Sequence, residues 1–238
     1  MPAEFVDYVH GTRTPKFPLY FIGGNNEDFE TLHNVQEGGE LAPGMHYLGR
    51  VGVRTFRGLR VGFLSGIFAP RFYEQPLAEP RSKDTAKQAG YFRKAEVEFL
   101  WNAPGVDLLL THEWPRGLFR SPHATEGPSP RPWMGNKLTR ELAGRVQPKW
   151  LLCGHSHMPW AATMRHSARA PLTHVACLDQ AARPEAALFW VEWKGREPQR
   201  AGWGTSGAVA WERGQIWEAD RAPLAQLPAS LPEEPPEE

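Results

Sequence analysis

The chain has 238 residues, enough for one sizeable domain with its own core. Lys plus Arg equals Asp plus Glu at 27 each, so no global charge attracts nucleic acid or an anionic membrane. With only two cysteines, the chain is not expected to be a disulfide scaffold. No segment has the roughly 20 apolar residues of a membrane span, and the first residues lack the apolar core of a signal peptide. We therefore expect a cytoplasmic protein.

Strands are predicted at three places in the first part of the chain. LYFIG, residues 19–23, is a short apolar run that predicts a buried strand. Residues 45–66 alternate between apolar and polar side chains around Arg57-Gly58, which predicts two strands joined in a hairpin. VDLLLT, residues 106–111, is apolar nearly throughout and predicts a strand buried on both faces.

Helices are predicted at two places. Residues 84–102 predict the longest helix, with Asp84 as its N-cap, and the proline-rich residues 69–83 before it predict irregular structure. Asn136 predicts the N-cap of a shorter helix that runs through Val146.

The remaining segments are mostly strands. KWLLC, residues 149–153, predicts another buried strand, and four later runs rich in β-branched and aromatic residues predict short strands: PWAATM, LTHVACL, AALFWVEW and GAVAWERGQIWE. Residues 116–135 predict a long irregular loop. The tail of Pro and Glu predicts disorder, so we expect one domain over residues 1–221 and a disordered tail over residues 222–238.

Residues of types that bind metals follow three of the apolar runs. Asn25, His112 and the pair His155 and His157 each come directly after a different run. In α/β folds, sites are built where strands end in loops. Neutral imidazole ligates transition metals and an amide oxygen suits harder ions, so these residues predict a divalent metal site.

Each feature alone has a simpler interpretation. Two asparagines after two glycines are typical of a turn, a single His-x-His is weak evidence for a metal site, and His112 alone is typical of a hydrogen-bonded histidine. Their joint occurrence at strand ends, in this order, favours the metal site.

Five further residues are expected to have structural roles. Gly24 and Gly154 fit tight turns with close backbone approach. His174 is expected to be structural, and Cys153 and Cys177 are expected to be small buried packing groups.

The order of the motifs resembles the calcineurin-like metallophosphoesterase superfamily. Gly-Asn-x-Glu at residues 24–27 comes first, His112 second, and Gly-His-x-His at residues 154–157 third. The strings SGIF, THEWPRG and THVACLD, in register with these motifs, resemble the branch of RNA lariat debranching enzymes. The similar segments span residues 17–180, most of the chain.

The resemblance implies an α/β (α+β) fold, a β-sandwich flanked by helices, and a metal-dependent reaction. Members bind two divalent ions, Mn, Fe or Zn, that clamp a phosphate and activate water. Carried over to this sequence, the ligands of one metal would be Asn25, His112 and His155, and His157 would belong to the other.

The resemblance also implies a substrate-recognition loop over about residues 69–93. Its cations, together with one after the second motif, would contact substrate phosphates: Arg71, Arg81, Lys83, Lys87, Arg93 and Arg116. A solvated surface is the alternative interpretation of these charges. The expected partner is a phosphodiester substrate, either RNA or a nucleotide, with no membrane and no obligate protein partner.

Two departures from the family pattern bear on activity. The Asp-x-His and Gly-Asp motifs that precede Gly-Asn in the family are absent, so we expect a fold without its first β-α-β segment, one or two metal ions, and a start codon assigned too far downstream. The resemblance gives Asn26 and Glu27 catalytic positions, but the family has histidine where Asn26 stands. An amide cannot donate a proton at neutral pH, so Asn26 predicts slow cleavage of poor leaving groups.

Two functions remain open at this point. The first is a phosphoesterase, a hydrolase in which metal-activated water attacks a phosphodiester. The second is a catalytically impaired module of the same fold that binds a ligand or RNA.

Overall fold

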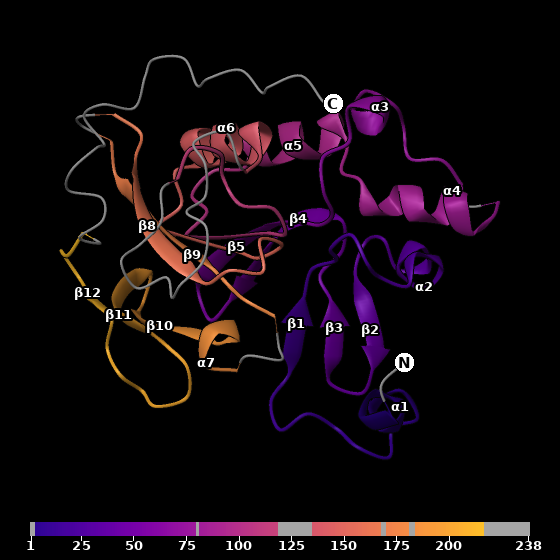
Figure 1. The fold of residues 1–238 in the computed structure, drawn as a ribbon, viewed down its shortest axis with the longest axis horizontal. Helices are drawn as coiled ribbons and strands as arrows, with labels where there is room; N and C mark the ends of the chain where they lie inside the picture. The colour runs from indigo at the N-terminus through magenta and orange to yellow at the C-terminus, as the bar shows by residue number, and fades with distance from the viewer. Residues whose placement is uncertain (1–2, 80, 119–134, 168–169, 181–183, 217–238) are drawn as a thin grey trace. The chain divides into compact units, whose positions relative to one another are not determined.

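The computed structural model describes residues 3–79, 81–118, 135–167, 170–180 and 184–216 (Figure 1). The chain divides into unit 1, Met1–Gly52 with Phe63–Leu100, and unit 2, Val53–Gly62 with Trp101–Glu238. Single-domain organisation over residues 1–221 stays a prediction. The predicted disordered tail and residues 119–134 of the predicted loop lie outside the described residues.

Unit 1 contains a small mixed sheet with the order β1-β3-β2 (Figure 1). β1 (Leu19–Phe21) runs parallel to β3 (Met45–Tyr47), which pairs antiparallel with β2 (Gly39–Ala42), and α1 (Ala3–Val9) precedes them. The prediction that β1 is buried was wrong, because Leu19 and Tyr20 are 44% and 46% exposed. Within the described residues, β1 is an edge strand that pairs with β3 alone.

The helices of unit 1 are short. α2 (Phe29–Asn34) begins after Asp28, whose side chain accepts a hydrogen bond from the backbone N–H of Thr31. It is followed by α3 (Pro70–Tyr73), α4 (Lys83–Lys87), the 3-10 helix η1 (Gln88–Gly90) and α5 (Lys94–Trp101). The predicted irregular segment over residues 69–83 therefore contains one helical turn.

The predicted continuous helix over residues 84–102 was wrong. The chain leaves the helix at Gly90, where the backbone pairs with Ile67 instead: the Ile67 N–H donates to the Gly90 carbonyl at 2.8 Å and the Phe92 N–H donates to the Ile67 carbonyl at 3.0 Å. A Cβ at Gly90 would lie 2.6 Å from the Phe29 ring, so the close packing needs glycine. The N-cap is Ser82 rather than the predicted Asp84.

A six-stranded sheet has the order β4-β5-β6-β7-β9-β8, and β6 to β9 belong to unit 2. β4 (Val51–Phe56) and β5 (Leu59–Leu64) form the predicted hairpin, and both turn residues, Arg57 and Gly58, have positive φ, at 49° and 86°. Such φ values match the twist of a two-residue hairpin.

The centre of this sheet is parallel. β6 (Leu108–Thr111), β7 (Trp150–Cys153) and β9 (Leu172–Cys177) run in one direction, and β8 (Trp160–Arg165) pairs antiparallel with β9. α6 (Lys137–Val146) begins at Asn136, whose side chain accepts from the Thr139 N–H, as predicted. Parallel strands that end together place their following loops at one edge of the sheet.

A second sheet of unit 2 has the order β10-β11-β12. Its strands are β10 (Phe189–Lys194), β11 (Glu197–Trp203) and the two-residue β12 (Trp211–Glu212), and α7 (Pro184–Ala187) precedes them. A core cluster joins both sheets through Trp150 and Trp211. The mixed content of strands and helices confirms the predicted α+β class, and among the described residues no helix has the length and apolar character to span a membrane.

Candidate functional site

Two of the predicted ligands meet at the edge of the parallel sheet in unit 2. β6 and β7 are adjacent, and His112 follows the end of β6 while His155 follows the end of β7. The Nε2 atom of His112 lies 3.0 Å from Nδ1 of His155, and the ring centroids are 4.7 Å apart. The strand ends therefore bring together two imidazoles that are far apart in the sequence.

Both rings are neutral near pH 7. Burial, and to a smaller extent the charges of His155 and His157, lower the pKa of His112 to about 4. Burial also lowers the pKa of His155, with His157 as the second cause. Since the neutral imidazole is the form that binds a metal, this donor set fits a divalent transition metal.

The backbone of the Gly-His-x-His loop is strained at the two histidines. His155 and His157 have φ of 65° and 53°, in the left-handed region that residues with a side chain rarely adopt. Gly24 and Gly154, which are predicted to fit tight turns, do not have positive φ, so the left-handed backbone of this loop lies at its histidines. Strain of this kind persists where the surroundings hold a residue in place, which is typical of functional sites.

The strand β9 holds this loop. The Cys177 thiol donates to the Gly154 carbonyl at 3.2 Å, and the Ser156 hydroxyl lies 3.2 Å from Cys177 Sγ and donates to the Met158 carbonyl at 3.0 Å. Cys153 and Cys177 are both free and buried, as predicted. Cys177 thereby also fixes the loop backbone, a role that its sequence position did not reveal.

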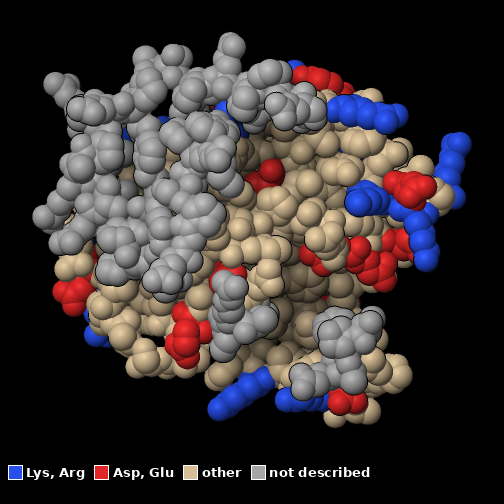
Figure 2. All heavy atoms as spheres, viewed as in Figure 1, with Lys and Arg blue, Asp and Glu red and all other residues tan. Residues whose placement is uncertain are grey.

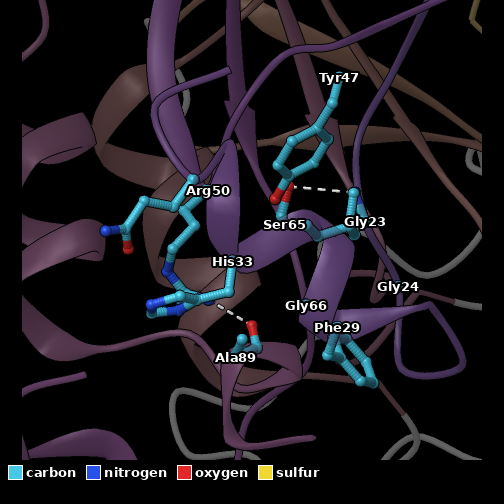
Figure 3. A pocket seen from close by; sticks show the side chains of 11 residues that line it. Gly23, Gly24, Phe29, His33, Tyr47, Arg50, Ser65, Gly66 and Ala89 are labelled. Carbon is cyan, nitrogen blue, oxygen red and sulfur yellow. Dashed lines mark hydrogen bonds between the residues drawn. The ribbon is translucent and has the colours of Figure 1, made fainter. Parts of the chain in front are cut away.

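In unit 1, the first glycine of Gly-Gly-Asn-Asn is held by a buried serine (Figure 3). Ser65 accepts from the Gly23 N–H at 3.1 Å and donates to the Gly49 carbonyl at 2.7 Å, and the Gly66 N–H donates to the Gly23 carbonyl at 2.8 Å. Gly23, Ser65 and Gly66 border a cavity of about 10 Å³, the size of one water.

Arg50 fixes the opposite side of that cavity (Figure 3). Its guanidinium donates to both carboxylate oxygens of Glu96, at 2.6 and 3.0 Å, and to the carbonyls of Ala89 and Tyr91. Both charged side chains are nearly buried, at 8% and 14% exposure. The segment around residues 88–91 is therefore anchored to the connection between β3 and β4.

The Asn25-Asn26 turn borders a groove of about 490 Å³ in unit 1. Asn25 is half-buried, Asn26 and Glu27 are exposed, and Glu27 accepts from the Gly24 N–H at 2.8 Å. The facing wall is α4, with Lys83 and Lys87 one helical turn apart. Figure 2 shows basic and acidic side chains side by side over α2 and α4.

The other predicted phosphate contacts differ in accessibility. Arg71 and Arg81 are exposed, and Arg116 is half-buried. Arg93 is 4% exposed, and its guanidinium donates to the carbonyls of Phe72 at 2.9 Å and Gln88 at 3.2 Å. Arg93 therefore ties α3 to η1 and does not enter the proposed set of substrate-binding residues.

Asn25 and His157 are the other two predicted ligands. Asn25 lies in unit 1, so a shared metal site of Asn25 with the histidines stays a prediction. His157 is exposed and contacts Gln180. Gln180 was not among the predicted site residues, and the one sign of it in the sequence is that a polar residue follows soon after an apolar strand. Across the described ranges, no group of three or more His, Cys, Asp or Glu side chains is arranged to hold a metal.

No protein-family model matches the chain. The chain is similar to lariat debranching enzyme A of Xenopus laevis, with 32% identity over 174 residues that cover 68% of the chain and 33% of that protein. The human lariat debranching enzyme is 29% identical over 177 residues, which cover 69% of the chain and 32% of that enzyme. The lariat debranching enzyme of Schizosaccharomyces pombe is 26% identical over 187 residues, which cover 74% of the chain and 40% of that enzyme.

The similarity extends over most of this chain but over a smaller part of its relatives. The chain spans about a third of the length of the curated relatives it matches. Lariat debranching enzymes are its homologues, and its mixed sheets and helices are consistent with the α+β metallophosphoesterase-like fold predicted from the motifs.

Proposed function

We propose that the chain is a metallophosphoesterase that hydrolyses phosphodiesters with the help of bound divalent metal. The observation that carries the proposal is the pair of neutral imidazoles, His112 and His155, at the carboxyl ends of two adjacent parallel strands. The similarity to lariat debranching enzymes supports a phosphodiester as the substrate class.

The proposed metal ligands are His112, His155 and His157, with Asn25 as a further ligand by resemblance to the family. Mn, Fe and Zn all suit imidazole and amide donors, and the ligand types do not select among them. A divalent ion bound there supplies a Lewis acid that polarises a phosphoryl oxygen and lowers the pKa of water.

The residues of unit 1 would orient the substrate and compensate its negative charge. The Asn26 amide can hydrogen-bond a phosphate oxygen, and Glu27 keeps the turn closed through the Gly24 N–H. The exposed Lys83 and Lys87 ammonium groups on the facing wall of the groove would attract a second phosphate. This arrangement favours a substrate with more than one phosphate, such as RNA or a nucleotide.

Asn26 limits the chemistry at the leaving group. An amide does not donate a proton at neutral pH, and general acid catalysis typically contributes about 10²–10⁴-fold. We therefore expect good leaving groups, such as a nitrophenolate, to be released much faster than a ribose hydroxyl.

The test is hydrolysis of bis(p-nitrophenyl) phosphate by the chain after chelation and re-addition of Mn²⁺, Zn²⁺ or Fe²⁺. Hydrolysis is expected only with metal, and His155→Ala should abolish it. His10→Ala, which changes an exposed histidine of unit 1, is the matched control and should retain the wild-type rate. A metal-independent rate, or equal rates for His155→Ala and wild type, would contradict the proposal.

A second function is favoured by one observation. Asn26 carries an amide that does not donate a proton at neutral pH, which fits a module of this fold that binds a ligand or RNA without turnover. Tight binding of a phosphodiester without hydrolysis at any metal concentration would establish this function. A cytoplasmic location goes with either function.

A further inference from the structure

One contact beside the proposed ligands lies outside the motifs. The side-chain amide nitrogen of Gln180 is 2.5 Å from Nδ1 of His157. Both side chains are exposed, so burial does not hold them together. Among the described residues, the hydrogen bond to Gln180 is the contact that orients the His157 ring, whose backbone has φ of 53°.

The backbone on both sides of the contact is held firmly. Gln180 lies just beyond β9, where the Leu178 N–H donates to the Cys153 carbonyl at 2.8 Å and the Asp179 N–H donates to the Ala186 carbonyl at 3.1 Å. His157 lies in the loop that Cys177 and Ser156 fix. Gln180 is therefore presented to His157 by the same strand that braces the loop.

We propose that Gln180 is a positioning residue that fixes the ring of His157 through Nδ1 and so leaves Nε2 as the nitrogen that binds the metal. The proposal rests on the function proposed above. In the described arrangement the amide N–H donates to Nδ1, so the ring proton is on Nε2. The ring can ligate through Nε2 only when that proton is on Nδ1.

A glutamine can serve both tautomers. A half-turn of its amide exchanges the N–H₂ donor for the Oε1 acceptor, which then accepts the Nδ1–H of the ligating ring. A carboxylate at the same place only accepts and would hold the proton on Nδ1 at all times. Partners that orient a ligating histidine in this way typically change metal affinity about 10–100-fold.

The experiment measures Mn²⁺ binding by calorimetry for the full chain and three variants. Gln180→Ala should weaken binding about 10–100-fold, and Gln180→Glu should restore it to the wild-type level or above. Gln199→Ala is the matched control, because it removes a glutamine whose amide donates to the Glu197 carbonyl within β11. Its affinity should equal that of wild type.

A second measurement reads the tautomer without any metal or activity. Long-range ¹H–¹⁵N spectra of the metal-free chain should place the His157 ring proton on Nε2 in wild type and on Nδ1 in Gln180→Glu. This measurement uses only wild type and Gln180→Glu, so it tests the proposal even if Gln180→Ala fails to fold. A protein in which Gln180 is merely structural would show the same tautomer in both.

The outcomes separate the two proposals. Wild-type chain that binds no Mn²⁺ would overturn the proposed metal-dependent function. Wild-type chain that binds Mn²⁺ while Gln180→Ala binds it equally or more tightly would overturn only the role of Gln180, since it would mean that Nδ1 is the ligating atom or that the contact is without effect.

Discussion

His174 makes the stability of unit 2 depend on pH. The residue is 8% exposed, its ring lies 5.3 and 4.6 Å from the rings of Trp150 and Trp211 by centroid distance, and its Nδ1 lies 3.2 Å from the Thr163 hydroxyl. Burial lowers its pKa from 6.5 to about 4. The folded state therefore keeps His174 neutral at pH values where the unfolded chain already binds a proton.

The sign and size of the effect follow from this difference in pKa. A lowered folded-state pKa contributes stability that is present above about pH 6.5 and is lost as pH falls toward about pH 4. Between about pH 7.5 and about pH 5 the linkage relation gives a loss of about 2 kcal/mol of unfolding free energy from this one group.

Urea unfolding at both pH values, for wild type and His174→Gln, measures this loss. Glutamine keeps a polar side chain without a titrating ring, so the variant should be less stable at neutral pH but should lose about 2 kcal/mol less on acidification. The other buried histidines contribute equally to both proteins and cancel in the comparison. Equal losses in wild type and variant would refute the assignment.

Three further predictions concern unit 1. Asn26→His should raise kcat for an unactivated diester, by up to about 10²–10⁴-fold, because imidazolium can protonate the leaving oxygen; no gain would mean that another group already donates the proton. Replacing Lys83 and Lys87 by alanine should raise KM for a substrate with several phosphates and flatten its salt dependence, with kcat unchanged, and an unchanged KM would contradict their proposed role. Glu96→Ala should cost about 3–5 kcal/mol in urea unfolding because it leaves the buried Arg50 guanidinium without its carboxylate, and a loss below about 1 kcal/mol would contradict that role.

The meeting of His112 and His155 was predictable from the sequence. Each follows an apolar run, and parallel strands that end together place their loops at one edge. The Asn136 cap and the Arg57-Gly58 hairpin were predictable for a similar reason, since the local side chains and backbone conformation decide them.

The missed features depend on contacts between distant segments. Residues 84–102 have helical character, but the fit of Gly90 against Phe29 and the pairing of its neighbours with Ile67 interrupt the helix. The left-handed φ of His155 and His157 occurs in a loop that is bonded to β9, and a modest enrichment of histidine at positive φ does not predict it at two positions of one loop. Gln180 likewise gains its role only because β9 ends beside the loop.

The most direct test of metal-dependent hydrolysis is a titration of the metal-free chain with Mn²⁺ in which binding and the hydrolysis rate of bis(p-nitrophenyl) phosphate are followed together. The rate should rise in step with metal occupancy in wild type, and His112→Ala should lose both binding and rate. Hydrolysis that is independent of occupancy, or His112→Ala that binds and turns over like wild type, would contradict the proposed site.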